Sequence, residues 1–193
     1  NGGFAAFTFR GGERRCATLF ATQTREVTSL LCSLRLHIAN RLDLIPENSY
    51  CPLWVCNFPL FELKDGKVSS QHHPFTMPDR TGFSPTDTEK VLGLNSRAYD
   101  LVINGEEIGG GSIRIHKMET QKKVFQALGL TREEVETKFG FFLRALEYGT
   151  PTHGGIALGF DRICALLTGH DSIRDVIAFP KTTSASCLMT RSP

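Results

Sequence analysis

Two glycine-rich apolar segments each carry one arginine, and these arginines are the side chains in the sequence most suited to ligand chemistry. The first segment runs from Glu107 to His116 with Arg114 near its end, and the second runs from Gly154 to Arg162. Glycine leaves room for a flat ligand against the backbone, and a guanidinium offers a planar fork of donors to a carboxylate or phosphate. The pair predicts a site for two anionic groups, as an enzyme that joins a carboxylate to a nucleotide would need.

Strand alternation predicts where the polar residues of the first segment point. Arg114 alternates with two isoleucines, so Arg114 and Ser112 are expected to face away from the packed side of a strand. Glu107 would by simple alternation face the other side, but a bulge in the triple glycine Gly109–Gly111 would bring it to the same face. Glu107 is then a candidate Mg²⁺ ligand or ribose contact. The alternative for Arg114 is a solvent-facing strand residue without a ligand, and the alternative for Glu107 is a surface acid beside the turn.

Two further polar groups flank these segments. Asp100 begins the partner strand of the first segment and would lie near the same glycines, where it could accept a hydrogen bond from an amino group. Arg162 follows an apolar strand and opens a helix, a position at which anions bind. The alternative for Arg162 is a structural ion pair with its neighbour Asp161.

A paired histidine, His72-His73, opens a long segment that extends to Asn95 and has a loop-like sequence. Loops of this length within a compact domain are usually functional lids or disordered excursions. Paired histidines can ligate zinc, but no third ligand follows at a suitable spacing. We therefore expect a loop whose histidines contact a ligand.

The composition is that of an ordinary globular protein. The 193 residues are 40% hydrophobic and 22% charged, with a net charge of +2, so an RNA partner has to be argued from the site. The six cysteines form no C-x-x-C pair, which favours a reduced chain. The sequence has no apolar run of the length that spans a membrane, and residues 1–15 show no initiator methionine or signal-peptide pattern.

Hairpins and helices alternate along the chain without strict βαβ order, which predicts an α+β fold. The strongest hairpin signal is the Asn104-Gly105 turn, and Thr131 with Glu134 predicts a capping box at a helix start. The expected strands are Cys16–Ala21, a buried strand Leu53–Cys56, Leu101–Ile103, Glu107–His116 and Ile156–Phe160, with a turn at Lys64–Lys67. The expected helices are Thr24–Leu42, Met118–Leu128, Thr131–Gly149 and Ile163–Thr168.

Taken together, the segments resemble the C-terminal part of the catalytic domain of bacterial-type aspartyl-tRNA synthetases, which are class II enzymes. The strings that carry the resemblance are LRLHIANRLDLI, PLWVCNFPLFE, HHPFTMP, RAYDLVINGEEIGGGSIRIH, KFGFFLRALEYGTPTHGGIALGFDRICALLTG and SIRDVIAFPKTTSASCLMT. The string GGIALGFDR is similar to class II motif 3. The resemblance implies a partial class II core, mainly antiparallel sheet flanked by helices, over residues 34–193. Residues 1–33 would be the tail of an inserted domain.

The resemblance also implies a role for each candidate residue. Arg114 would pair with the side-chain carboxylate of L-aspartate, and Arg114, Arg162 and Glu107 would be the catalytic residues. His72, His73 and Asp100 would complete the aspartate site, with the two histidines on a loop that closes over the amino acid. Glu107 would contact ATP through Mg²⁺, and the remaining ATP contacts would come from Gly159, Phe160, Asp161 and Arg162.

The implied reaction forms aspartyl-adenylate from L-aspartate and ATP, then transfers the aspartyl group to tRNA-Asp. The resemblance implies a homodimer in the full-length enzyme, no membrane partner, and a location in the mitochondrial matrix or, alternatively, the bacterial cytoplasm. Because motifs 1 and 2 and an anticodon-binding barrel are not found, we expect this chain to be a fragment that does not aminoacylate alone. The alternatives are nondiscriminating charging of tRNA-Asp and tRNA-Asn, and a noncatalytic paralogue that binds an amino acid or adenylate.

Overall fold

The computed structural model describes residues 4–11, 14–21, 25–46, 49–187 and 189–190, and the side chains from Leu30 onward within these ranges. The chain divides into two compact units, Asn1–Tyr50 and Cys51–Pro193. In the first unit, β1 (Phe4–Gly11) pairs antiparallel with β2 (Arg14–Ala21), and α1 (Arg25–Arg41) follows. The predicted strand at residues 16–21 and the predicted helix are confirmed, although Thr24 lies outside the described residues.

The leucines and isoleucines of α1 at three- and four-residue spacing, which are typical of an apolar helix face, are only partly buried. Leu31 is buried, and Leu34 and Ile38 are half-buried, whereas Leu30 and Leu42 are exposed. The boundary predicted at residue 33 falls inside α1, and the structure divides after Tyr50. The assignment of residues 1–33 to an inserted domain stays a prediction.

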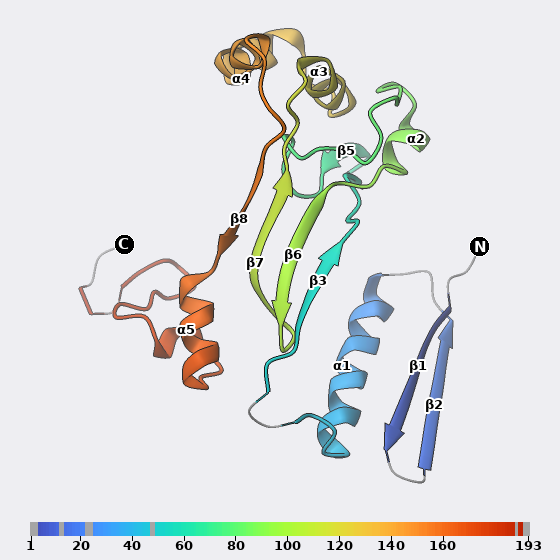
Figure 1. Cartoon of the computed structure of the whole chain (residues 1–193), viewed down its shortest axis with the longest axis vertical. Coiled ribbons are helices and arrows are strands. Elements are labelled where there is room, and N and C mark those ends of the chain that lie inside the picture. The colour runs from blue at the N-terminus through green and yellow to red at the C-terminus, as the bar shows by residue number, and fades with distance from the viewer. Residues whose placement is uncertain (1–3, 12–13, 22–24, 47–48, 188, 191–193) are drawn as a thin grey trace. The chain divides into compact units, whose positions relative to one another are not determined.

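A four-stranded antiparallel sheet forms the centre of the second unit (Figure 1). Its strand order is β3 (Pro52–Cys56), β6 (Ala98–Ile103), β7 (Glu106–Ile113) and β8 (Gly154–Leu158). The turn between β6 and β7 is the predicted one, with Asn104 at φ 53° and Gly105 at φ 88°. Both values suit the tight type of turn that asparagine and glycine favour.

The boundaries of β8 and of the next helix differ from those predicted. We expected a strand over Ile156–Phe160 and a helix from Ile163, but β8 begins at Gly154 and α5 spans Phe160–Thr168. The reason is pairing with β7, which extends from Gly109 opposite Leu158 to Ile113 opposite Gly154. Because β7 pairs with them, Gly154 and Gly155 adopt strand conformation despite the low strand propensity of glycine.

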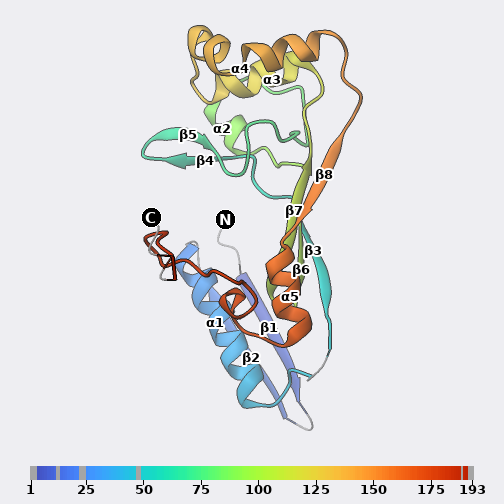
Figure 2. The same ribbon diagram turned by 90° about the vertical axis from the view of Figure 1, so that its left-hand side faces the viewer.

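Two helices, α3 (Met118–Ala127) and α4 (Arg132–Glu147), lie beyond the end of β7 in both ribbon views (Figures 1 and 2). The predicted capping box at the start of α4 is present: the Glu134 amide donates to Thr131 Oγ1 over 3.2 Å, and the Thr131 amide donates to Glu134 Oε2 over 2.9 Å. A cluster of phenylalanine rings and leucines holds these helices to the preceding loop. Its buried members are Phe125, Leu143 and Leu146.

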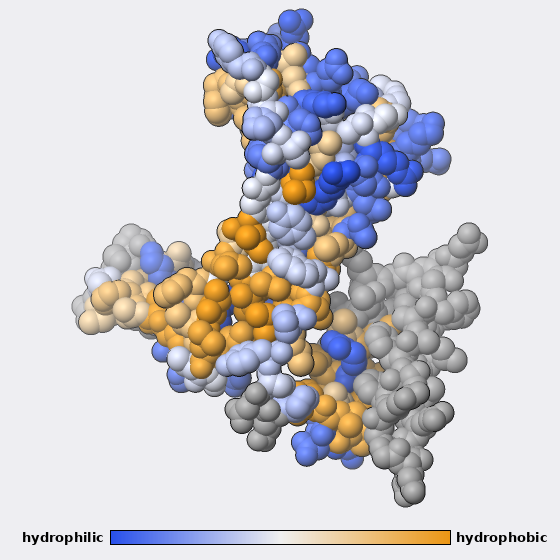
Figure 3. Space-filling model, viewed as in Figure 1, coloured by the Kyte–Doolittle hydropathy of each residue, from blue (hydrophilic) through white to orange (hydrophobic). Residues whose placement is uncertain are grey.

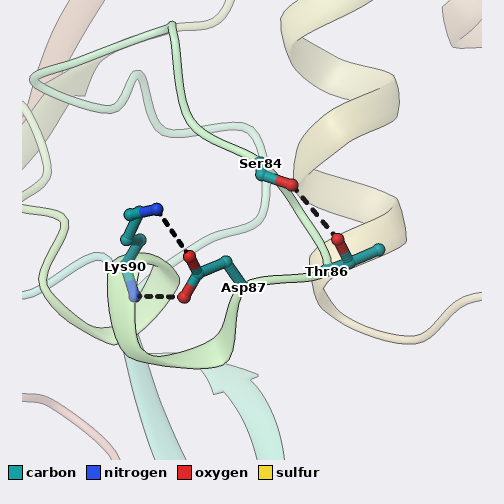
Figure 4. A network of polar contacts seen from close by, with 4 residues as sticks. All are labelled: Ser84, Thr86, Asp87 and Lys90. Atoms are coloured by element: carbon teal, nitrogen blue, oxygen red, sulfur yellow. Dashed lines mark hydrogen bonds and ion pairs between the residues drawn. The ribbon is translucent and has the colours of Figure 1, made fainter.

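The segment predicted as one long loop, residues 72–95, is more ordered than expected. It contains the short helix α2 (Thr88–Leu92), whose N-cap Asp87 accepts from the Lys90 amide and also forms an ion pair with the Lys90 ammonium at 2.8 Å (Figure 4). Isolated strand bridges join Thr76 to Arg114 and Pro78 to Ser96. These long-range bridges, which local sequence does not reveal, attach the segment to the sheet.

A small hairpin of β4 (Phe61–Lys64) and β5 (Lys67–Ser70) precedes this segment, turning at Asp65 (φ 51°) and Gly66 (φ 74°) as predicted. The main core cluster joins the hairpin, the ordered segment, the end of β7 and α3. The unit closes with α5 and a short 3₁₀ helix, Ile173–Asp175. None of the helices in the described ranges is long and apolar enough to cross a membrane.

The expectation that β3 is a buried strand is wrong. Leu53 is 51% and Trp54 is 57% exposed, and because consecutive side chains point to opposite faces, neither face of this edge strand is covered by the described residues. Apolar side chains are exposed on the other edge as well, where Leu158 is 54% exposed. Figure 3 shows apolar residues gathered over α5 and the adjoining ends of the strands.

Candidate active site

A β-bulge in β7 places the predicted acidic and basic residues on one face of the sheet. Asp100 lies opposite Gly110, and Val102 lies opposite Glu107, with a register shift between Leu101 and Val102 that leaves Ile108 as the extra residue. The residues that lie directly opposite one another share a face. Asp100 and Glu107 therefore lie on the same face. The predicted bulge is confirmed, but it lies at Ile108, one residue before the triple glycine.

Gly110 leaves the space that the two carboxylates occupy. A Cβ at this glycine would lie 2.5 Å from Asp100 Oδ1 and 3.8 Å from Glu107 Oε1. Burial raises the pKa of Asp100 above its ordinary value, and the charge of Glu107 raises it further, while His72 acts in the opposite direction. The pair is a concentration of negative charge that a cation would stabilise.

Arg162 reaches this pair from the start of α5. Its Nη1 donates to the Glu107 carbonyl oxygen over 2.5 Å and lies 3.9 Å from Glu107 Oε1. Arg162 thus pairs with Glu107, and the described residues show no ion pair between Arg162 and its neighbour Asp161. The Gly159 amide donates to the Ile108 carbonyl over 2.7 Å, so the start of α5 is tied to the bulge. The Phe160 ring is 75% exposed, and Asp161 is also exposed.

Arg114 lies at the other end of the same face, immediately after β7. Its amide donates to the His153 carbonyl over 2.9 Å, and the residue bridges to Thr76. The side chain is half-buried, and its Nη1 is buried without a hydrogen-bond partner among the described residues. A buried guanidinium nitrogen without a partner is costly, and an anion would satisfy it. Ser112, which we expected to be turned away from the packed side, is 5% exposed.

The paired histidines lie near different charged residues of the site: the charge of Arg114 acts on His73, and His72 acts on Asp100. The His72 ring contacts Phe58 edge-on at 4.7 Å, and the His73 ring contacts Phe75 at 4.8 Å. His73 Nδ1 accepts from the Phe75 amide over 3.2 Å, which places the ring proton on Nε2 in the neutral form. Partial burial lowers the pKa of His73, and the charge of Arg114 lowers it further. His73 is therefore neutral near pH 7.

The site has two polar centres, one on each part of the same sheet face, and the histidine loop adds His73 to the second. The first comprises Asp100, Glu107 and Arg162, and the second comprises Arg114 and His73. Gly110 and Arg114 are four residues apart along an extended strand, a separation of roughly 13 Å. The face can therefore hold a ligand with a carboxylate near one end and phosphates near the other. Within the described ranges, no group of three or more His, Cys, Asp or Glu residues could hold a metal ion by itself.

Sequence reasoning missed the residues that support the histidine loop. The Phe75 ring stacks on Phe142 at 4.3 Å, and the Gln121 side chain donates to the Pro74 carbonyl over 2.9 Å. Tyr99 was also missed; its hydroxyl donates to the Gly155 carbonyl over 3.0 Å and so links β6 to β8 across β7. The string HHPFT, which includes Phe75, is the one signal in the sequence that could have drawn attention to this support.

The fold is that of a class II tRNA synthetase catalytic core. The chain belongs to the family described as "tRNA synthetases class II (D, K and N)", whose profile matches residues 16–183. Among solved structures, it is similar to an asparaginyl-tRNA synthetase of Entamoeba histolytica in complex with asparaginyl-adenylate. That similarity has a TM-score of 0.51 and 25% identity, over 70% of this chain and 26% of the other. An aspartyl-tRNA synthetase of the same organism has a TM-score of 0.51 at 24% identity, over 69% and 23%, which supports the fold alone.

Curated relatives are considerably more similar. The chain is 58% identical over 168 residues to aspartate–tRNA(Asp/Asn) ligase 1 of Syntrophus aciditrophicus (strain SB), covering 86% of this chain and 23% of the relative. It is 52% identical over 190 residues to the aspartate–tRNA(Asp/Asn) ligase of Persephonella marina, covering 94% and 31%. The chain thus spans less than a third of the length of these relatives. Both come from bacteria, which gives no support to the expected mitochondrial location.

Proposed function

We propose that this chain forms the aspartate- and ATP-binding part of the catalytic site of an aspartate–tRNA ligase. The observation that carries the proposal is the buried, unpaired Nη1 of Arg114 on the same sheet face as Asp100 and Glu107. The names of the bacterial relatives at 58% and 52% identity support the same activity.

In this proposal Arg114 binds the side-chain carboxylate of L-aspartate through its planar fork of donors. His73 lies against the arginine and, being neutral, adds no second charge to it. His72 borders the same pocket on the loop. Asp100 accepts a hydrogen bond from the α-amino group, and an ammonium there would offset the repulsion between Asp100 and Glu107.

ATP would bind at the other centre, along Gly159, Phe160, Asp161 and Arg162. Arg162 would donate to the terminal phosphates, and Gly159 would let a flat base or ribose approach the backbone. The site also suits Mg²⁺, because Glu107 is an oxygen donor and Mg²⁺ is commonly held by one or two carboxylates plus phosphates. When bound, Mg²⁺ would neutralise part of the phosphate charge.

The chemistry would proceed by positioning and charge stabilisation. An oxygen of the α-carboxylate of aspartate attacks the α-phosphorus of ATP, a new P–O bond forms, and the bond to the leaving pyrophosphate breaks. A terminal ribose hydroxyl of tRNA then attacks the aspartyl carbonyl carbon, and AMP leaves. We further propose that both tRNA-Asp and tRNA-Asn are charged, as the relatives' names state for those proteins, in a bacterial cytoplasmic homodimer.

A chimaera tests the proposal in a full-length background. Residues 16–183 replace the matching segment of the Syntrophus aciditrophicus ligase, and aspartate-dependent exchange of pyrophosphate into ATP is measured. We expect the parent chimaera to be active and Arg114→Lys to lose roughly 10²–10³-fold, because lysine cannot make the bidentate pair. Arg132→Lys, at an exposed arginine in α4, is the matched control and should leave the activity unchanged.

Two outcomes would overturn the proposal. One is a folded chimaera that lacks aspartate-dependent exchange, and the other is full activity of Arg114→Lys. Aspartate binding by calorimetry without exchange would instead favour the noncatalytic paralogue. Charging of tRNA-Asp alone, with tRNA-Asn left uncharged, would overturn the nondiscriminating part.

A further inference from the structure

Gln121 is a fully buried amide that the proposed chemistry does not use. It lies in α3 with 0% exposure, and its Nε2 donates to the Pro74 carbonyl over 2.9 Å. Its Oε1 is buried without a hydrogen-bond partner among the described residues. A buried polar atom without a partner destabilises a fold, whereas an apolar side chain of the same length would not. Packing alone therefore gives no reason for a glutamine at this position.

The carbonyl that Gln121 holds belongs to the residue between His73 and Phe75. Phe75 is itself fixed on both sides: its ring stacks on Phe142 at 4.3 Å with an interplanar angle of 12°, and its carbonyl accepts from the Ile115 amide over 2.9 Å. The ring also meets two further phenylalanines of α3 and α4 edge-on. Phe75 thus anchors the C-terminal side of the loop to the helices and to the strand that carries Arg114.

On the N-terminal side of Pro74, the Gln71 amide donates to the Leu60 carbonyl over 3.1 Å and the His72 ring contacts Phe58 at 4.7 Å, but neither contact involves His73. His73 is exposed and held through its own ring, by the Phe75 amide, and through its carbonyl, which accepts from the Thr76 amide over 3.0 Å. Both of these bonds are local and would move together with the loop. The bond from Gln121 ties the Pro74 carbonyl to a rigid helix 47 residues further along the chain.

We propose that Gln121 is a positioning residue of the aspartate site: by holding the Pro74 carbonyl, it sets the His73 ring beside the Arg114 guanidinium. This inference rests on the proposed function, because it assigns the His73–Arg114 pair to aspartate. The α3–α4 helices are then more than a cover for the core. They fix the distance between the loop and the arginine, and so the shape of the amino-acid pocket.

The test is Gln121→Met in the full-length chimaera, which keeps the side-chain length and removes both polar atoms. We expect KM for aspartate to rise about tenfold, the size expected for loss of one neutral hydrogen bond, with kcat and KM for ATP unchanged within twofold. Hydrogen exchange of the Phe75 and Thr76 amides should become faster. Thr120→Val, at a buried neighbour in the same helix with 5% exposure, is the matched control and should alter none of these quantities.

The readouts separate this inference from the proposed function. An unchanged KM for aspartate together with unchanged amide exchange would overturn the positioning role. A fall in kcat together with a rise in both KM values and a lowered melting temperature would show a purely structural role, and would overturn the positioning role too. A parent chimaera without aspartate-dependent exchange would refute the proposed function, while the amide exchange would still report whether Gln121 anchors the loop.

Discussion

Replacement by alanine should leave stability nearly unchanged at Gly110 in β7 but lower it strongly at the adjacent Gly111. A Cβ on Gly110 would lie 2.5 Å from Asp100 Oδ1 and 3.8 Å from Glu107 Oε1, and both atoms are the ends of side chains. A Cβ on Gly111 would overlap the Gly155 carbonyl oxygen and lie 2.9 Å from the Ile156 Cα, and both atoms belong to the backbone of β8. Side-chain ends can rotate away, whereas a paired strand cannot move without losing its hydrogen bonds.

The magnitudes follow from that difference. In Gly110→Ala the displaced carboxylate costs about 1 kcal/mol, which the lower chain entropy of alanine largely offsets, so stability should change by less than about 1 kcal/mol. In Gly111→Ala, overpacking of about 1–3 kcal/mol adds to the weakening of about two ladder hydrogen bonds at about 1 kcal/mol each. The sum, about 3–5 kcal/mol, is a large part of the 5–15 kcal/mol typical of a domain.

Urea unfolding of the chain, followed by far-ultraviolet circular dichroism, measures the stability, and pyrophosphate exchange in the chimaera measures the activity. Gly110→Ala should lower the exchange rate about 10²-fold because the carboxylates are displaced. Gly82→Ala, where nothing lies within 4 Å of the new Cβ, is the control and should be equal to the parent or about 0.4–1 kcal/mol more stable. The reasoning is refuted if Gly111→Ala is no less stable than Gly110→Ala, or if Gly110→Ala retains full activity.

Three further changes have defined outcomes. Asp100→Asn removes a carboxylate whose pKa is raised by burial and by Glu107, so the ionised carboxylate lowers the stability of the fold above its ordinary pKa. The melting temperature at pH 7 should therefore stay the same or rise, while exchange activity falls about 10²-fold. A lower melting temperature would contradict this. The lowered pKa of His73, due to partial burial and Arg114, contributes stability that is present above the ordinary pKa near 6.5 and is lost as the pH falls below it. The free energy of unfolding should therefore fall less between pH 7.5 and pH 5.5 in His73→Gln than in the parent. Thr131→Ala should cost about 1 kcal/mol in urea unfolding through loss of the capping box, and activity in the chimaera should not change.

Features that depend on neighbouring residues were predictable from the sequence. Asn104-Gly105 specified the β6–β7 turn, and Thr131 with Glu134 specified the start of α4, because a turn or cap is decided by a few adjacent side chains. The α+β class also followed from the order of such local signals.

Features that depend on distant partners were not predictable in detail. The Glu107 contact of Arg162 joins residues 55 apart, and no local pattern distinguishes it from the pair with Asp161 that we weighed. The bulge was expected from the need to bring Glu107 to one face, but its position at Ile108 depends on the register between β6 and β7. The support of the histidine loop by Phe75 likewise requires helices that come later in the chain.

The extra residue at Ile108 decides which face of the sheet carries the residues that follow it in β7, relative to Glu107. Counted from the Asn104-Gly105 turn, every side chain beyond the bulge points to the side opposite the one an unbroken strand would give it. A regular strand that kept Ile108 would turn Arg114 to the side opposite Glu107, whereas deletion of Ile108 together with the bulge would leave an even spacing of six residues and keep the two side chains on one side. In this strand, an odd spacing between Glu107 and Arg114 is therefore compatible with a shared face only because the bulge is present.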